Sequence, residues 1–345
     1  MLLAFLHKIG ARENLSSAEA HDAMLVILNG QATTPQISAF LMGLRTKGET
    51  AEELLGFARA MREKAATVHV GLDLDSEPLL DTSGTGGGDG GATFNISTIA
   101  AFVVAGAGVR VAKHGNRSFS SQCGSADILE QLGVHVSLPP DRAAQAIREI
   151  GVGFLFAPLL HPAMKHAQPA RVELKMRTVF NLLGPLTNPA RATRQLIGAP
   201  SAQTAELMAN ALAGLGPERA FIVHGSDGLD EVTTTGATLV FEVTGSRVHS
   251  FTWTPADFGI PQAVSEALRG GDRACNAAIA TAVLQGAPGA QRDIVLVNSA
   301  AALIAAGAAT DLREAMQRAA QSIDSGAART KLQQLAEFSQ DQTRA

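Results

Sequence analysis

The residues best suited to chemistry begin with a glycine-rich run, in which six of the eight positions from Gly84 to Gly91 are glycine. The run lies between an apolar segment, PLLD, and a helical pattern, STIAAFVVAGAG. Glycine loses more backbone freedom on ordering than any other residue. A glycine-rich turn between a strand and a helix lets backbone N–H groups and a helix N-terminus approach a phosphate. We therefore interpret the run as a phosphate-binding loop, against the alternative of a floppy surface loop.

The spacing of the glycines narrows the kind of phosphate ligand. Gly86-x-Gly88-x-x-Gly91 fits the dinucleotide fingerprint, which also needs an acidic residue at the end of the next strand to bind the ribose. The next strand pattern, VRVAK, ends instead in Lys113. The Gly-Lys-Ser/Thr of a P-loop does not occur in the sequence. We expect a phosphate compound that is neither a nicotinamide cofactor nor ATP held by a P-loop.

A second polar cluster follows the VRVAK pattern. The stretch KHGNRSFSS (113–121) supplies two cations, three hydroxyls and an amide, and Gly124-Ser125 opens the next helical pattern. Such a set suits a ligand with several phosphate groups and sugar oxygens. The alternative is a solvated polar loop, but its place beside the first loop favours binding.

An acidic pair, Asp230-Glu231, follows a third strand pattern, RAFIVHG. Adjacent carboxylates in a loop suit Mg²⁺, which prefers oxygen ligands and often keeps several waters. Alone, such a pair is usually only a charged loop, but two phosphate loops in the same sheet favour magnesium. None of the nine histidines has zinc-site spacing, so they are expected to be packed or solvated.

Taken together, these stretches closely resemble the anthranilate phosphoribosyltransferases. The resemblance extends over the helical N-terminal region and much of the remaining chain. The motifs that carry it are the glycine run with TFNIST, KHGNRSFSS, GSADILEQLG, FLFAPLLHPAMKHAQPAR, TVFNLLGPLTNP and HGSDGLDEV. KHGNR followed by S-S and G-S-A-D is highly specific. The related pyrimidine nucleoside phosphorylases share the architecture but differ at this loop.

The resemblance implies an activity and a set of site residues. The activity is Mg²⁺-dependent transfer of the phosphoribosyl group from phosphoribosyl pyrophosphate (PRPP) to the amine of anthranilate, a step of tryptophan biosynthesis. It implies electrostatic roles for Lys113 and Arg117, with no acid–base residue and no covalent intermediate. Magnesium is implied at Ser97, Asp230 and Glu231, and anthranilate at Gly84, Asn116 and Arg171. The PRPP-binding residues implied are Gly84, Gly88, Asp89, Thr93, Asn95, Ile96, Ser97, Thr98, Lys113, His114, Gly115, Asn116, Arg117, Ser118, Phe119, Ser120, Ser121 and Ser125.

The glycine run departs from the family's pattern in one respect. The family's usual run is Gly-Thr-Gly-Gly-Asp-Gly, and this chain carries one more glycine among Gly86 to Gly88. Two rival functions keep the same fold. A nucleoside phosphorylase would use inorganic phosphate with thymidine or uridine. A non-catalytic relative that binds phosphoribosyl compounds or nucleic acid would bind its ligand without turnover. Loss of Arg171, Asp230 or Glu231 would favour the latter, but all three are present.

The predicted elements that must position these residues follow two patterns, one all-helical and one of alternating strands and helices. The first 65 or so residues are helical, with capping patterns at Ser16–Glu19, Thr34-Pro35 and Thr50–Glu53. From about residue 70, strand and helix patterns alternate, which indicates a mostly parallel sheet covered on both faces. The strand patterns are PLLD, VRVAK, VHVSL, GFLFA, RQLIGA and RAFIVHG, followed by a hairpin that turns near Gly245; two Ala-rich helical stretches close the chain.

The predicted fold class is α/β, with a small all-helical N-terminal domain and a larger α/β domain built on a central, mostly parallel sheet flanked by helices. We expect a helical domain over 1–68 and a catalytic, PRPP-binding domain over 69–345. Residues 161–189 carry prolines and helical patterning and fit neither of the two patterns. That segment is either an excursion that joins part of 161–190 to the helical domain or an active-site wall.

Composition sets the remaining expectations. The 345 residues are 46% hydrophobic and 17% charged, enough for a sizeable core, and the net charge of −4 argues against a general nucleic-acid binder. The N-terminus reads as an amphipathic helix rather than a signal peptide, and no apolar run is long enough for a membrane span. The two cysteines are far apart, which favours a reducing cytoplasm. The family resemblance implies a homodimer through the helical domain.

Overall fold

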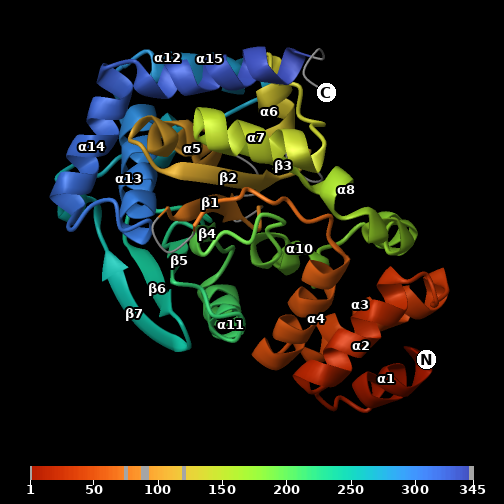
Figure 1. The fold of residues 1–345 in the computed structure, drawn as a ribbon. Coiled ribbons are helices and arrows are strands. Elements are labelled where there is room, and N and C mark those ends of the chain that lie inside the picture. Colours follow the sequence, from red (N-terminus) through yellow and green to blue (C-terminus); the bar gives the residue numbers. More distant parts are fainter. Residues whose placement is uncertain (1, 74–76, 87–92, 119–121, 342–345) are drawn as a thin grey trace.

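The computed structural model describes residues 2–73, 77–86, 93–118 and 122–341. Its N-terminal part is a lobe of four helices, shown in red and orange in Figure 1. These helices are α1 (Leu2–Gly10), α2 (Ser17–Leu28), α3 (Thr34–Lys47) and α4 (Ala51–Lys64). The lobe confirms the predicted helical region.

Capping boxes begin three of these helices. Ser16 with Glu19 and Thr50 with Glu53 cap α2 and α4 as predicted. For α3 the prediction was wrong by one residue, because the cap is Thr33, whose side chain accepts from the N–H of Gln36. A cap hydroxyl bonds to the N–H three residues on, and the Thr33–Gln36 spacing satisfies this, whereas Pro35 lies second in the helix rather than first.

The larger part of the chain is built on a seven-stranded sheet. Its order is β3-β2-β1-β4-β5-β6-β7, in which the first five strands are parallel and the last two antiparallel. The strands are β1 (Leu79–Gly84), β2 (Arg110–Gly115), β3 (Val152–Phe156), β4 (Arg194–Gly198), β5 (Arg219–Gly225), β6 (Thr238–Thr244) and β7 (Arg247–Trp253). The predicted α/β class and the hairpin at Gly245 are confirmed.

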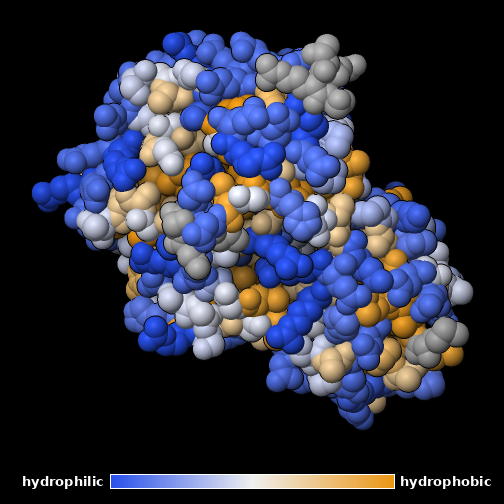
Figure 2. Space-filling model, in the orientation of Figure 1, coloured by the Kyte–Doolittle hydropathy of each residue, from blue (hydrophilic) through white to orange (hydrophobic). Residues whose placement is uncertain are grey.

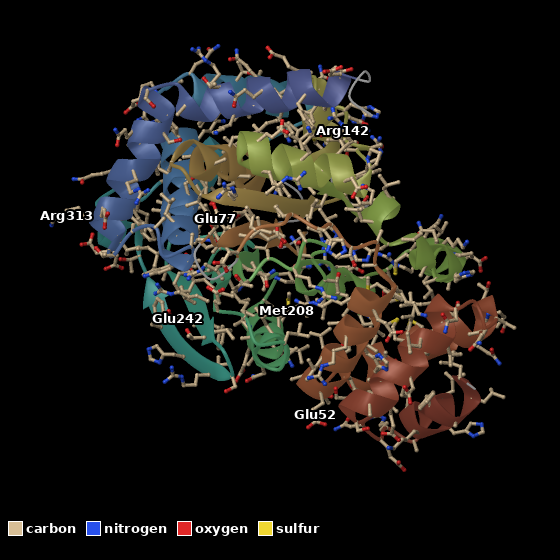
Figure 3. All side chains as sticks on the ribbon, in the orientation of Figure 1. Glu52, Glu77, Arg142, Met208, Glu242 and Arg313 are labelled. Carbon is tan, nitrogen blue, oxygen red and sulfur yellow. The ribbon has the colours of Figure 1, made fainter. Side chains whose placement is uncertain are left out.

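Helices cover both faces of the sheet (Figure 1). One face is packed by α5 (Ile96–Gly106), α7 (Pro140–Ile150) and α13 (Ala290–Ala305). The outer helices are α6 (Ser125–Gln131), α12 (Arg273–Leu284), α14 (Leu312–Asp324) and α15 (Ala327–Gln340), and two short 3-10 turns are η3 (Pro255–Phe258) and η4 (Ser265–Leu268). On the other face α11 (Ala202–Ala213) contacts β5, β6 and α4, and its buried Met208 lies between sheet and lobe (Figure 3).

Two sequence predictions about single elements were wrong. VHVSL (134–138) is not a strand: its alternate apolar residues are buried, but the N–H of His135 donates to Ser339 Oγ at 2.8 Å rather than to a strand. The alternation of apolar and polar residues therefore reflects burial of the apolar side chains beneath α15, not strand pairing. The chain closes with four helices, α12 to α15, instead of two helical stretches, because left-handed glycines such as Gly286 and Gly326 interrupt the pattern.

The segment 161–189 connects the two parts. It holds η1 (Pro162–His166), α9 (Gln168–Leu174), α10 (Phe180–Leu183) and η2 (Gly184–Leu186), and it follows α8 (Ala157–Leu160). Ala170, Phe180 and Leu183 belong to the same buried cluster as the lobe residues Phe40 and Phe57. Other residues of the segment line a cavity beside the sheet. The segment therefore both packs on the lobe and forms one wall of the cavity.

The strand order places ligands at one edge. The chain runs from β1 outward to β2 and β3, then crosses back to β4 and β5, so the direction reverses between β1 and β4. Ligands of open parallel sheets bind at the carboxyl ends of strands at such a point. None of the described helices combines the length and the apolar composition that a membrane-spanning helix requires.

Candidate active site

The first loop (residues 84–98) begins where β1 ends and contacts the acidic loop that follows β5. The N–H of Gly86, which has φ +68°, donates to Asp230 Oδ2 at 2.8 Å. A Cβ on Gly84 would lie 2.9 Å from that oxygen, and a Cβ on Gly198 would lie 1.7 Å from the Asp230 carbonyl oxygen. Gly198 needs to be glycine because the Asp230 backbone approaches it so closely, whereas a side chain at Gly84 would displace the Asp230 carboxylate. Gly88 and Asp89, two predicted PRPP ligands, lie outside the described residues.

The acidic pair lies against the start of α5. Glu231 Oε1 accepts from the N–H of Ser97 at 3.2 Å, while Asp230 is the adjacent residue. Burial and the Asp230 carboxylate raise the pKa of Glu231 to about 8, although Lys113 opposes the shift. The two adjacent carboxylates and the nearby hydroxyl supply oxygen ligands of the kind that divalent cations prefer. A bound divalent cation would also reduce the repulsion between the two carboxylates.

These residues fit a magnesium site that is completed by water and substrate better than a metal site built from protein ligands alone. Among the described residues no group of three or more His, Cys, Asp or Glu side chains could hold a metal ion. Mg²⁺ commonly binds through one or two carboxylates and completes its shell with water and substrate phosphate oxygens. Asp230, Glu231 and the Ser97 hydroxyl could supply such a partial set, at the edge where the first loop begins.

Lys113 lies beneath this pair, and its side chain is almost wholly buried. Its Nζ donates to the carbonyl of Thr82 at 2.5 Å and to Ser97 Oγ at 3.3 Å. Burial lowers the pKa of Lys113, and the carboxylates of Asp81 and Glu231 oppose the shift. The ammonium thus links β1 to α5 and offsets the negative charge of the acidic pair.

The second loop (residues 113–125) is closed by short polar contacts. Asn116 and Ser125 bond reciprocally: the Asn116 N–H donates to Ser125 Oγ at 3.2 Å, and that hydroxyl donates to the Asn116 carbonyl at 3.1 Å. A Cβ on Gly115 would lie 2.3 Å from Ser125 Oγ, so the loop turns tightly there. Phe119, Ser120 and Ser121 lie outside the described residues.

Arg117 does not point a free guanidinium at a ligand. Its Nη1 and Nη2 donate to the two carboxylate oxygens of Glu130, each at 2.5 Å, and its guanidinium lies 5.5 Å from the centre of the Phe156 ring. The bidentate contact raises the pKa of Arg117 further above its ordinary value. Its predicted electrostatic role toward PRPP would require it to leave Glu130.

A cavity of about 550 Å³ opens beside the second loop, between the α/β part and the lobe. Its walls include apolar side chains such as Met61 and Phe180, and its polar residues include Asn116 and Arg171. Arg171 is half-buried, which lowers the pKa of its guanidinium, and the ring centre of Phe180 lies 5.4 Å away. Within the described ranges it has no ion-pair partner. The cavity therefore suits a partly apolar molecule that carries an anionic group such as a carboxylate.

Two buried histidines form another part of the cavity wall. The His114 and His161 ring centres lie 5.1 Å apart, and His114 Nδ1 lies 3.0 Å from the Gly184 carbonyl. Burial, with a smaller effect of His114, lowers the pKa of His161 to about 3. Burial also lowers the pKa of His114. Both rings are therefore neutral at pH 7.

This arrangement predicts acid sensitivity. His161 stays neutral in the folded chain down to about pH 3, whereas the unfolded chain takes up a proton near pH 6.5. Between pH 7 and pH 5 the free energy of unfolding should fall by ~2 kcal/mol on account of His161. Urea unfolding of wild type and His161→Gln at both pH values measures this. An equal pH dependence in both proteins would contradict it.

The remaining predicted PRPP residues lie where the first loop enters α5. Ile96 and Thr98 are buried, so their contribution to a ligand would come through backbone groups. Thr93 pairs with Arg269 through an isolated antiparallel bridge, and Asn95 Nδ2 donates to the Cys123 carbonyl at 3.1 Å. The first and second loops are thus in direct contact at Asn95.

Some site residues were missed in the sequence. Arg177 Nη2 donates to the Thr85 carbonyl in the first loop at 3.0 Å, and the Asp230 carboxylate partly offsets the effect of burial on its pKa. The sequence signal for Arg177 was a basic residue in the 161–189 segment. That signal could not indicate which loop the side chain contacts. Gly198, at the end of a predicted strand, gave a similar weak signal. Figure 2 shows strongly hydrophilic residues along the junction of lobe and sheet.

Comparison with known proteins gives one consistent result. The family model described as "Glycosyl transferase family, a/b domain" matches residues 76–329, and "Glycosyl transferase family, helical bundle domain" matches residues 3–65. Among curated relatives, the anthranilate phosphoribosyltransferase of Solibacter usitatus is 61% identical over 98% of each chain, and that of Moorella thermoacetica is 54% identical over 96% of this chain and 97% of the relative.

Solved structures agree with these relatives. The anthranilate phosphoribosyltransferase of Thermus thermophilus aligns with a TM-score of 0.90 at 42% identity, covering 99% of both chains. The enzyme of Saccharomyces cerevisiae in complex with PRPP and Mg aligns with a TM-score of 0.89 at 30% identity, covering 98% of this chain and 97% of that one. A further yeast structure holds 4-fluoroanthranilate.

Proposed function

The chain belongs to the anthranilate phosphoribosyltransferase family and moves the phosphoribosyl group of PRPP onto the amine of anthranilate, and we propose that it does so where the second loop meets the cavity. The products are N-(5-phosphoribosyl)anthranilate and pyrophosphate, in tryptophan biosynthesis. The observation that carries the proposed location is the position of Asn116, which belongs to the phosphate loop and also lines the cavity. A phosphoribosyl group on the loop would therefore adjoin an aromatic acid in the cavity.

We assign the site residues to two substrates. The first loop, from Gly84 to Thr98, and the second loop, from Lys113 to Ser125, hold PRPP. Arg171 pairs with the anthranilate carboxylate, because a half-buried guanidinium without an ion-pair partner in the described residues favours an anion. Asn116 and Gly84 complete the anthranilate site. Asp230, Glu231 and Ser97 hold magnesium, which when bound neutralises the diphosphate leaving group.

The proposed reaction needs little acid–base catalysis from the protein. An aromatic amine is neutral at pH 7 and needs no strong base to attack the anomeric carbon. The barrier lies in expelling a highly charged leaving group while positive charge develops on the sugar. Backbone N–H groups of the first loop and the charge of Lys113 stabilise the departing pyrophosphate. The Arg171 cavity orients the amine toward the sugar.

A fluorescence assay tests this function directly. Loss of anthranilate fluorescence on adding the protein, PRPP and Mg²⁺ is the expected result, with no loss when any of the three is left out. The phosphorylase alternative is tested in parallel with thymidine or uridine and inorganic phosphate. Cleavage of either nucleoside without use of anthranilate would overturn the proposal.

We also propose the chain's domain division and assembly. A helical domain over 1–68, joined by part of 161–190, and a catalytic domain over 69–345 agree with the cluster shared by Phe40 and Phe180. Exposed Leu3 on α1 and Val172 on α9, both helices packed on α3, support a homodimer through the lobe. Sedimentation should give twice 35.8 kDa, and a monomer would contradict this. Both cysteines are free thiols, which supports a reducing cytoplasm.

A further inference from the structure

We propose that the amino-terminal end of α12 holds the two phosphate loops in the relative position that PRPP requires. The residues concerned are Gly270, Arg273 and Asn276, hereafter the α12 bracket. The proposal rests on the function proposed above, and it concerns residues that do not touch the substrates. They act as positioning residues through Asn95 in the first loop and Asp127 behind the second.

The bracket, together with the residue just before it, contacts the first loop at three consecutive residues. Arg269, just before the bracket, forms the antiparallel bridge with Thr93. A Cβ on Gly270 would lie 2.6 Å from the Phe94 backbone nitrogen, so the two backbones are in close contact. Asn276, which is 2% exposed, donates from Nδ2 to Asn95 Oδ1 at 3.0 Å. The whole entry into α5 thus lies against the start of α12.

Asn95 passes this contact on to the second loop. Its amide accepts from Asn276 on one side and donates to the Cys123 carbonyl at 3.1 Å on the other. The orientation of the Asn95 amide is therefore set by a neighbour that donates. Asn276 is itself held, because its Oδ1 accepts from the N–H of Gly271 at 2.8 Å. Removal of the Asn276 amide would leave the bond to the Cys123 carbonyl as the side-chain contact, among the described residues, that still orients Asn95.

The bracket reaches the second loop separately through an ion pair. Arg273 Nη2 lies 2.7 Å from Asp127 Oδ1. Asp127 is 2% exposed, and its Oδ2 accepts from the N–H groups of Ser118 at 3.0 Å and Gly124 at 2.9 Å. One carboxylate thus joins both ends of the stretch that separates Ser118 from Gly124. A buried carboxylate is costly unless a cation faces it. Arg273 supplies the nearer cation from outside the loop, and Arg117 Nη1 lies 3.6 Å from the same oxygen.

The two routes have one consequence. PRPP spans both loops in the proposed site, so its affinity depends on their relative position as well as on the groups that touch it. Loosening either route should weaken PRPP binding because binding must then restore the position. Once PRPP is bound, the reacting groups are unchanged. The dissociation constant should therefore change more than kcat.

Calorimetric titration with PRPP and Mg²⁺ tests the bracket. Asn276→Ala should raise the dissociation constant at least tenfold, and Arg273→Met should raise it threefold to tenfold. Turnover at saturating PRPP should stay within threefold of wild type. Arg273→Lys, which keeps a cation, should bind nearly as wild type does. Since Arg273 is half exposed, its variants remain informative if Asn276→Ala fails to fold.

A matched control separates positioning from general stability. Ser322 is 3% exposed, and its Oγ donates to the Val103 carbonyl at 2.7 Å, near the end of α5 away from Asn95. Ser322→Ala should lower Tm as Asn276→Ala does and leave PRPP affinity unchanged. Wild-type affinity in both Asn276→Ala and Arg273→Met would overturn the bracket. A wild-type chain that neither binds PRPP nor uses anthranilate would instead overturn the proposed function.

Discussion

Replacing Asp230 by Asn and Glu231 by Gln together should reduce the rate of phosphoribosyl transfer at least 1,000-fold while the chain stays folded. The double change removes both carboxyl groups and almost no volume. A metal ion that stabilises a leaving group contributes several kcal/mol, and ~4 kcal/mol corresponds to about 1,000-fold in rate. Folding should not suffer, because the raised pKa of Glu231 shows that its ionised form is disfavoured beside Asp230.

Rates as a function of Mg²⁺ concentration, together with Tm without ligand, measure this effect. The double variant should need far more Mg²⁺ and should melt at or slightly above the wild-type temperature. Glu77→Gln with Glu242→Gln is the matched control, since it also removes two carboxylates. Glu77 pairs with Arg110 at the amino end of β1, and Glu242 pairs with Arg219, both away from the carboxyl edge (Figure 3). Normal magnesium dependence in the Asp230/Glu231 variant would remove the metal role.

The features predictable from the sequence are those that neighbouring residues determine. The boxes at Ser16 and Thr50 lie within four residues, so the local pattern suffices. The alternation of strands and helices predicts a parallel sheet, and a parallel sheet gathers the ends of its strands at one edge. That is why the glycine run, the Lys113 loop and the Asp230 loop were expected together, and why Gly86 does contact Asp230.

The features that were missed depend on contacts between distant segments. Asn276 and Asn95 are 181 positions apart, and Arg177 reaches Thr85 across 92. The apolar alternation at 134–138 showed burial, but it could not show that α15 rather than a strand covers it. Gly198 is required only because the Asp230 backbone folds back onto it. Such requirements become visible only when both partners are placed.

Arg171→Ala should abolish efficient use of anthranilate and leave PRPP binding almost unchanged. Loss of one partner of a desolvated charge pair removes about 2–5 kcal/mol, or about 30-fold to several thousand-fold in binding. The KM for anthranilate should rise by that factor. The PRPP dissociation constant should stay within threefold, because the phosphate loops lie on other elements. Stability should not fall, since burial disfavours this guanidinium while no ion-pair partner in the described ranges offsets it.

Two variants make the Arg171 test specific. Lys165 is an exposed cation that also lines the cavity, so Lys165→Ala removes the same charge from the same cavity. If Arg171 acts only by attracting anions at long range, both variants should weaken anthranilate use alike. If it pairs with the carboxylate, Lys165→Ala should change KM less than threefold. Arg171→Lys should recover only part of the loss, because an ammonium cannot reproduce the two parallel donors of a guanidinium. Equal loss of affinity for PRPP and anthranilate in Arg171→Ala would contradict the assigned role.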